Sequence, residues 1–145
     1  MIKKIFLITI LIFIGFVSAK AQEVTLFDSE GVAIAYVDYN KDLTIFLWNG
    51  TPVAFLKNDE GNMCLFGFNG KFLGWYNDGI IYNKRGDAVG ARKGAVNMMT
   101  EMEPVKNMQQ VAPMKPMTPS VPMQPAWSNS WSNTSLTHFL LLGRN

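Results

Sequence analysis

The sequence predicts an all-β fold built from four repeated antiparallel hairpins, and three observations support this prediction. A unit of about 20 residues recurs four times between residues 24 and 92, which is typical of a repeat architecture. Each unit carries a glycine in the same column, with an aromatic residue four positions earlier. Two of these glycines follow asparagine, and Asn-Gly between apolar runs is a strong hairpin signal. The repeat positions are Phe27 and Gly31, Phe46 and Gly50, Phe66 and Gly70, and Tyr82 and Gly86.

The second unit gives the clearest register for such a hairpin. If residues 49–50 form a two-residue type I′ turn, Phe46 pairs with Val53 on one face. On the other face Ile45 lies opposite Ala54, because side chains alternate along a strand. A large residue facing a small one recurs in the other units. This pattern predicts close approach on that side, about a pseudo-fourfold axis.

The first 21 residues have the form of a secretory signal peptide. Lys3 and Lys4 precede an apolar run that ends at a small-x-small cleavage pattern, residues 19–21. The apolar run is too short to cross a bilayer. We therefore expect cleavage after residue 21, export to the periplasm or out of the cell, and no membrane span afterwards.

Composition limits the classes of function open to residues 22–145. The chain has 13 basic and 11 acidic residues, and three of the basic ones lie in the predicted signal peptide. The remaining balance is close to neutral with no basic patch, which argues against nucleic-acid binding. Residues 22–96 are enough for one small hairpin domain. The single cysteine, Cys64, excludes an intramolecular disulfide, and we expect it to be a core thiol.

Residues 97–126 form a linker in which methionine alternates with proline. Proline at about every third residue prevents both helix and sheet, so we expect this segment to be extended or disordered. Thioethers are soft ligands that favour Cu(I), and two Met-x-x-Met spacings make copper binding a sharp alternative to a plain tether. The candidate copper ligands are Met99, Met102, Met114 and Met117.

The last segment, residues 127–145, becomes apolar again. Asn133, Thr134 or Ser135 can cap a short helix over residues 136–142. Seven residues do not make a helix stable in isolation, so we expect this segment to dock on an apolar surface. The hairpin domain is the expected surface, and a partner protein or a membrane is the alternative.

Enzymatic activity is not expected, and the sequence implies no cofactor. The only histidine lies in the tail, and no nucleophile motif surrounds any serine. The acidic residues before the tail lie in or beside polar turns, where they are expected to be solvated. Trp48 and Phe68 precede their Asn-Gly turns and are candidates for a contact surface, or for rim residues that receive the C-terminal segment.

The stretches LWNGTPVAFL and FGFNGKFLGWYNDGII resemble the 4-fold beta flower domain found in exported proteins of the Bacteroidota. The closing WSNTSLTHFL is similar to a tail that follows that domain. The resemblance covers residues 24–92 and, more loosely, residues 127–140. It implies a shallow barrel, the β-flower, whose hairpins are petals about a central axis. The family has no established activity, so the resemblance implies no catalytic residue.

The fourth repeat departs from the other three. Arg85 replaces asparagine at the turn, and Ala91 stands where the other units have a large aromatic residue. We expect this petal to be weaker than the others or to be covered by the tail.

Flower-like folds also look like the tubby-type β-barrel, and this analogy of fold implies contact with lipid or another hydrophobic ligand.

Taken together, the sequence predicts an exported, non-catalytic structural or interaction module. Its partner is expected to be a protein or another component of the cell envelope. The alternatives are Cu(I) binding through the methionine-rich tract and binding of a lipid or hydrophobic ligand.

Overall fold

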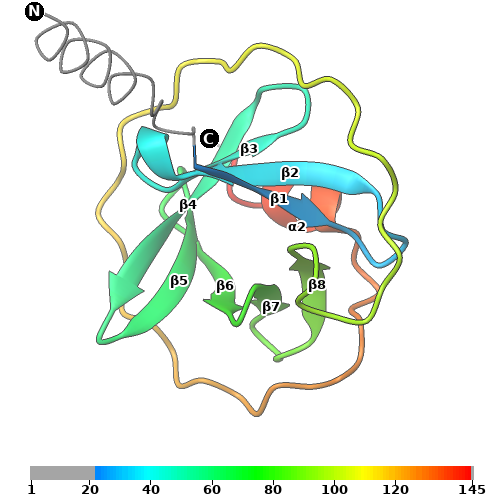
Figure 1. The fold of residues 1–145 in the computed structure, drawn as a ribbon. Helices are drawn as coiled ribbons and strands as arrows, with labels where there is room; N and C mark the ends of the chain where they lie inside the picture. Colours follow the sequence, from blue (N-terminus) through cyan, green and yellow to red (C-terminus); the bar gives the residue numbers. More distant parts are fainter. Residues whose placement is uncertain (1–21, 145) are drawn as a thin grey trace, which may run out of the picture.

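The computed structural model describes residues 22–144, which form a closed antiparallel barrel with a short helix at the C-terminal end (Figure 1). The strand order follows the chain, and the last strand closes the barrel by pairing with the first. The predicted signal peptide falls on residues 1–21, outside the described residues. The elements are β1 (Glu23–Phe27), β2 (Ala33–Asp38), the 3-10 turn η1 (Tyr39–Lys41), β3 (Thr44–Leu47), β4 (Pro52–Asp59), β5 (Asn62–Gly67), β6 (Phe72–Asn77), β7 (Ile80–Asn83), β8 (Ala88–Ala91) and α2 (Leu136–Leu141).

Each sequence repeat forms one hairpin, as predicted, in the pairs β1–β2, β3–β4, β5–β6 and β7–β8. In every hairpin the large apolar residue of the first strand pairs with a small residue of the second. The four hairpins therefore share one register, which confirms the repeat derived from the sequence. The pairs are Leu26 with Ala35, Ile45 with Ala54, Leu65 with Gly74, and Ile81 with Gly90.

The predicted two-residue type I′ turn at the hairpin tips is wrong, because each tip has one more residue than that turn allows. In the second unit the register shifts at the tip, so Phe46 pairs with Pro52 and not with Val53. The Asn49 side chain accepts the backbone N–H two residues further on at 3.0 Å, and Gly50 takes the positive φ of +90°. This local hydrogen bond stabilises a longer loop with a bulge. The same shift occurs in all four hairpins.

Two-residue turns with positive φ at both positions occur instead at two of the three connections between successive hairpins, and the first connection contains η1. Glu60 and Gly61 have φ values of 50° and 87°, and Asp78 and Gly79 have values of 50° and 81°. Glu60 and Asp78 are exposed, as expected for polar turns. The tips with their bulges therefore lie at one end of the barrel, and these tight polar turns lie at the other.

The inward side of the barrel forms the main apolar core, and α2 packs into it. The Ser135 side chain accepts the N–H of His138 at 3.1 Å, so the helix begins at Leu136 as predicted and ends one residue earlier than predicted, at Leu141. A Cβ atom at Gly90 would lie 2.8 Å from the Leu136 side chain, so the small residue there makes room for the helix. α2 contacts β2, β4 and β8. The C-terminal segment thus docks on the barrel of its own chain.

Aromatic side chains form a second apolar cluster on the outward side of the barrel, which we call the aromatic belt. In the belt Tyr36 stacks on Phe46 with 5.7 Å between ring centroids, and Phe55 stacks on Phe66 at 5.9 Å. The belt is buried although it lies outside the barrel, because the segment after residue 96 crosses over it. Its buried members include Tyr36, Phe46, Phe55, Phe66, Phe68 and Trp75.

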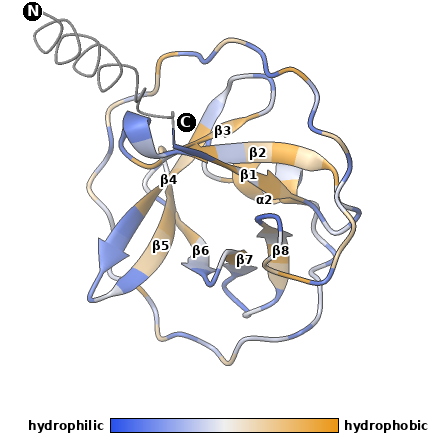
Figure 2. Cartoon of the chain, in the orientation of Figure 1, coloured by the Kyte–Doolittle hydropathy of each residue, from blue (hydrophilic) through white to orange (hydrophobic). Residues whose placement is uncertain are grey.

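Residues 97–126, the methionine- and proline-rich linker, follow a defined path round the barrel (yellow to orange in Figure 1). We call this segment the strap. Short hydrophobic and hydrophilic stretches alternate along it in Figure 2. The strap is extended, as predicted, because proline excludes it from helix and sheet. The prediction of disorder was wrong, because composition gives no sign of the aromatic belt on which the segment packs.

The strap has a repeat of its own, with a period of nine residues, that matches the hairpins one to one. Its equivalent positions Met99, Met108, Met117 and Ala126 lie at the four tip glycines. The residue two positions after Met99, Met108 and Ala126 donates its backbone N–H to the glycine carbonyl. The equivalent residue after Met117 is Pro119, which has no N–H to donate. The bonds run from Glu101 to Gly31 (2.8 Å), from Gln110 to Gly50 (2.9 Å) and from Ser128 to Gly86 (2.9 Å).

A second, three-residue period sorts the strap side chains by direction, as expected for a chain with three residues per turn. One row faces the barrel; within it Gln109 donates to Asp38 at 2.8 Å. Another row points into solvent. The barrel-facing row is Thr100, Glu103, Lys106, Gln109, Ala112, Lys115, Thr118 and Val121. The outward row is Met99, Met102, Val105, Met108, Val111, Met114, Met117 and Met123, each at least 90% exposed.

The strap makes alanine substitution at Gly50 more harmful than the same change at Gly70. Both residues have positive φ, at 90° and 86°, which costs a side-chain-bearing residue about 1–2 kcal/mol. A Cβ at Gly50 would also overlap the Met108 carbonyl, whereas at Gly70 the nearest strap atom is 3.8 Å away. In urea denaturation, Gly50→Ala should lower the free energy of unfolding by about 2 kcal/mol more than Gly70→Ala. Equal losses would mean that the strap does not press on the tip.

Candidate functional site

Of the two aromatic residues proposed as a contact surface, Phe68 is buried and Trp48 is half-buried. The Trp48 indole N–H donates to the Pro104 carbonyl of the strap at 3.2 Å, and its ring meets Tyr36 edge-on. Phe68 is 3% exposed and packs on Phe55 with 5.3 Å between ring centroids. Trp48 thus contacts the strap, and Phe68 belongs to an apolar cluster against which strap residues and Trp127 pack.

Two strap lysines nine residues apart hold the segment on the belt. Lys106 Nζ lies 4.3 Å from the Tyr36 ring centroid, and Lys115 Nζ lies 4.9 Å from that of Phe55. Cations over aromatic rings are attracted by the electron-rich ring face. Lys106 also forms a salt bridge with Glu23, and Lys115 forms one with Asp42 at 2.8 Å. The sequence signal for these contacts was the nine-residue repeat of the strap, which the sequence analysis missed.

The four candidate copper ligands lie on the outward row of the strap. Met99, Met102, Met114 and Met117 are each more than 90% exposed. In an extended chain of this type, three residues span about 9 Å, which is the backbone spacing between successive residues of the row. Within residues 22–144 no group of three or more histidine, cysteine or carboxylate side chains is placed to hold a metal ion. The four thioethers thus share one solvent-facing row of the strap.

Cys64 is a buried thiol of the aromatic belt, as the sequence predicted. It is 0% exposed and pairs with Trp75 across the hairpin. Burial, with a smaller contribution from the charge of Asp59, raises the pKa of the thiol to about 11. The nucleophilic thiolate is therefore suppressed at neutral pH. Burial also raises the pKa values of Tyr36, Tyr76 and Tyr82, so these phenols stay neutral as well.

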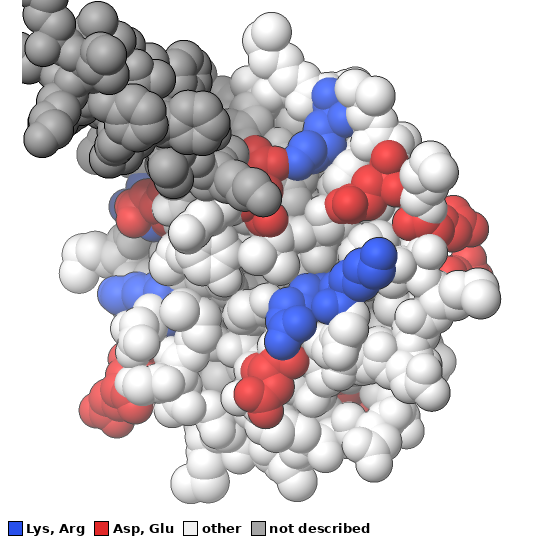
Figure 3. Space-filling model, in the orientation of Figure 1, with Lys and Arg blue, Asp and Glu red and all other residues white. Residues whose placement is uncertain are grey.

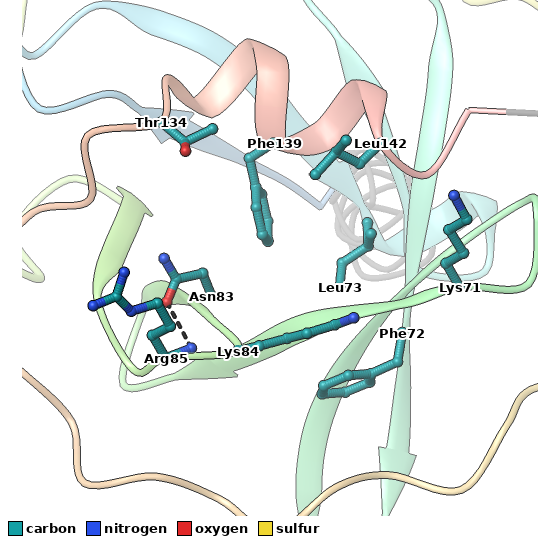
Figure 4. Close-up of a pocket in the computed structure, with 9 residues that line it drawn as sticks. All are labelled: Lys71, Phe72, Leu73, Asn83, Lys84, Arg85, Thr134, Phe139 and Leu142. Atoms are coloured by element: carbon teal, nitrogen blue, oxygen red, sulfur yellow. Dashed lines mark hydrogen bonds between the residues drawn. The ribbon is translucent and has the colours of Figure 1, made fainter.

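A cleft of about 390 Å³ opens between α2 and the tips of the β5–β6 and β7–β8 hairpins (Figure 4). Its apolar lining comes from both sides, with the Phe139 ring of α2 pointing into the space above β6. The polar lining is concentrated on the β7–β8 tip. The lining residues are the apolar Phe72, Leu73, Phe139 and Leu142, the polar Asn83 and Thr134, and the basic Lys71, Lys84 and Arg85.

The three basic side chains give the cleft a positive rim. Among the described residues, the salt bridges join Lys106 to Glu23 and Lys115 to Asp42, so none of the rim cations is neutralised. No acid contributes to the lining. By contrast, acidic and basic groups are interspersed over the face drawn in Figure 3.

The tip of the fourth hairpin, which differs in sequence from the other three, positions part of this basic rim. Asn83 Oδ1 accepts the backbone N–H groups of Arg85 and Asp87, both at 3.0 Å, which fixes the tip beside the cleft. Lys84 stands in the column that holds Trp48 and Phe68 in other repeats. The sequence gives a signal for this rim, because Arg85 departs from the repeat. It gives no indication that α2 lies on the other side of the cleft.

A protein-family model described as 4-fold beta flower protein matches residues 24–140. The match includes the hairpins, the strap and most of α2, so the chain belongs to the 4-fold beta flower family. Comparison with curated proteins and with solved structures found no match. In residues 22–144 no helix has the length and hydrophobicity needed to cross a membrane.

The burial of Cys64 predicts slow alkylation of the native protein. Iodoacetamide at pH 8 should label the native thiol at least about 100-fold more slowly than the chain in concentrated guanidinium, because the thiol reacts only when the barrel opens. A matched control carries Cys64→Ser and Met114→Cys, which moves the thiol to the outward row. That thiol should react as fast as an unfolded one. Fast labelling of native Cys64 would contradict the buried placement.

Proposed function

We propose that this 4-fold beta flower protein is a non-catalytic binding module, and that its ligand is a small amphipathic anion held in the cleft. The observation that supports this most directly is the combination of an apolar floor with three basic side chains that have no ion-pair partner among residues 22–144. An acyl or aryl group would lie against Leu73, Phe139 and Leu142. Its anionic head would lie at the rim.

The size and chemistry of the cleft agree with such a ligand. Its volume of about 390 Å³ falls in the range of small-molecule sites, which are mostly apolar with a few placed polar groups. Burying apolar ligand surface contributes about 25 cal/mol per Å². The cations add charge-assisted hydrogen bonds to the head group, with Asn83 and Thr134 as further polar groups of the lining.

The residues of the cleft favour binding over catalysis. The lining contains no carboxylate, histidine or cysteine to act as a general base or nucleophile. The predicted signal peptide supports export, which would expose the cleft to the amphiphiles of the cell envelope. A protein-binding role for Trp48 and Phe68 is less well supported, because the protein's own strap and belt already contact these rings.

Three probes that each carry a chain of ten carbons separate the contribution of charge from that of the alkyl chain. At pH 7.5 and low salt, calorimetric titration should show decanoate binding at least about tenfold more tightly than decanol or decyltrimethylammonium, because only decanoate pairs with the rim. The double substitution Lys84→Glu and Arg85→Glu should remove this preference. Lys93→Glu, which reverses a charge that lies outside the lining, is the matched control.

The thermal melting temperatures of both variants should stay near that of the parent, since neither change touches the core. Equal binding of decanoate and decanol would show that the rim does not select an anion. Unchanged decanoate binding in the Lys84 and Arg85 variant would place the site elsewhere. Either result would overturn the proposal.

A further inference from the structure

The outward row of the strap contains most of the protein's methionines. Its thioethers are Met99, Met102, Met108, Met114, Met117 and Met123, and they are 90–96% exposed. Large apolar side chains are seldom left this exposed in a regular series. The barrel itself contains one methionine within residues 22–96, Met63, and it is only partly exposed and packs against the core.

The direction of these side chains is set by the register of the strap. The three-residue period puts every methionine of the row on the side away from the barrel, and the barrel-facing row contains none. The strap is held by other groups, namely the backbone hydrogen bonds to the hairpin tips and the two lysines over Tyr36 and Phe55. The exposed thioethers therefore contribute little to the packing of the strap.

We propose that the outward row is a reversible oxidation site, at which the six methionines consume two-electron oxidants such as hydrogen peroxide. The thioether sulfur attacks one peroxide oxygen, the O–O bond breaks and a sulfoxide S–O bond forms. The displaced hydroxide takes up a proton and leaves as water. Sulfur is oxidised by two electrons and the peroxide is reduced. A methionine sulfoxide reductase with a dithiol donor reverses the step, releasing water and leaving a disulfide.

The fold separates this chemistry from its own stability. A sulfoxide is polar and normally disrupts an apolar core, but on the outward row it stands in solvent. The groups whose oxidation would damage the barrel are shielded: Cys64 and Trp75 are 0% and 1% exposed. Oxidation of the row should therefore leave the barrel, the strap path and the cleft intact. The row lies outside the cleft, so it can act whether or not the cleft binds a ligand.

The test is a titration with hydrogen peroxide, read by peptide mass spectrometry and by thermal melting. The six outward methionines should be oxidised before Met63, at least about tenfold faster, because reactivity follows exposure. The melting temperature should change by no more than about 2 °C when all six are sulfoxides, and reductases for both sulfoxide epimers should restore the original mass.

The matched variant replaces the six methionines by leucine, which keeps the size and exposure of the row but removes its sulfur. At an equal limiting dose of oxidant, this variant should lose more Met63 and melt lower than the parent. Equal damage to Met63 in the two proteins would overturn the proposal, because the row would then protect nothing. A fall in the parent's melting temperature with the first oxidised methionines would overturn it too, since the row would then be part of the packing.

Discussion

The strap backbone seats directly on the turns of the barrel, and three of the four tip glycines leave no room there for a side chain. This close approach buries the aromatic belt, which would otherwise be a large apolar surface open to water. A barrel made of strands of four to eight residues has little interior volume. The outer layer therefore supplies a second core, and the strap and the barrel depend on one another.

The strap also sets the position of the C-terminal segment on the barrel. After one circuit of the barrel it delivers Trp127, which stacks on Tyr82 with 4.4 Å between ring centroids, and then α2. The helix fills one end of the inner core and forms one wall of the cleft, and the tips of the third and fourth hairpins form the other wall. The cleft thus arises where the last repeat meets the last helix.

The sequence predicted the features that depend on local pattern. The large-to-small column from Leu26 to Gly90, the cap at Ser135 and the burial of Cys64 all follow from residue type and spacing. The prediction of the hairpin-tip geometry was wrong because the Asn49 side chain accepts the backbone N–H of Thr51. This local hydrogen bond competes with the two-residue turn that Asn-Gly usually favours. The strap and the cleft could not be predicted from composition, because both depend on contacts between residues far apart in the chain, such as Lys106 with Tyr36.

The two periods of the strap make its length as important as its composition. Loss of a single residue after Met102 would rotate every later side chain by a third of a turn, which would move the lysines into solvent and the methionines off the outward row. Loss of three residues would restore the rows but would move the later carbonyls away from their glycines. Only a change of nine residues, made together with the gain or loss of a whole hairpin, keeps both the three-residue rows and the match between strap carbonyls and tip glycines. Within this family the strap should accordingly accept many substitutions but very few insertions or deletions.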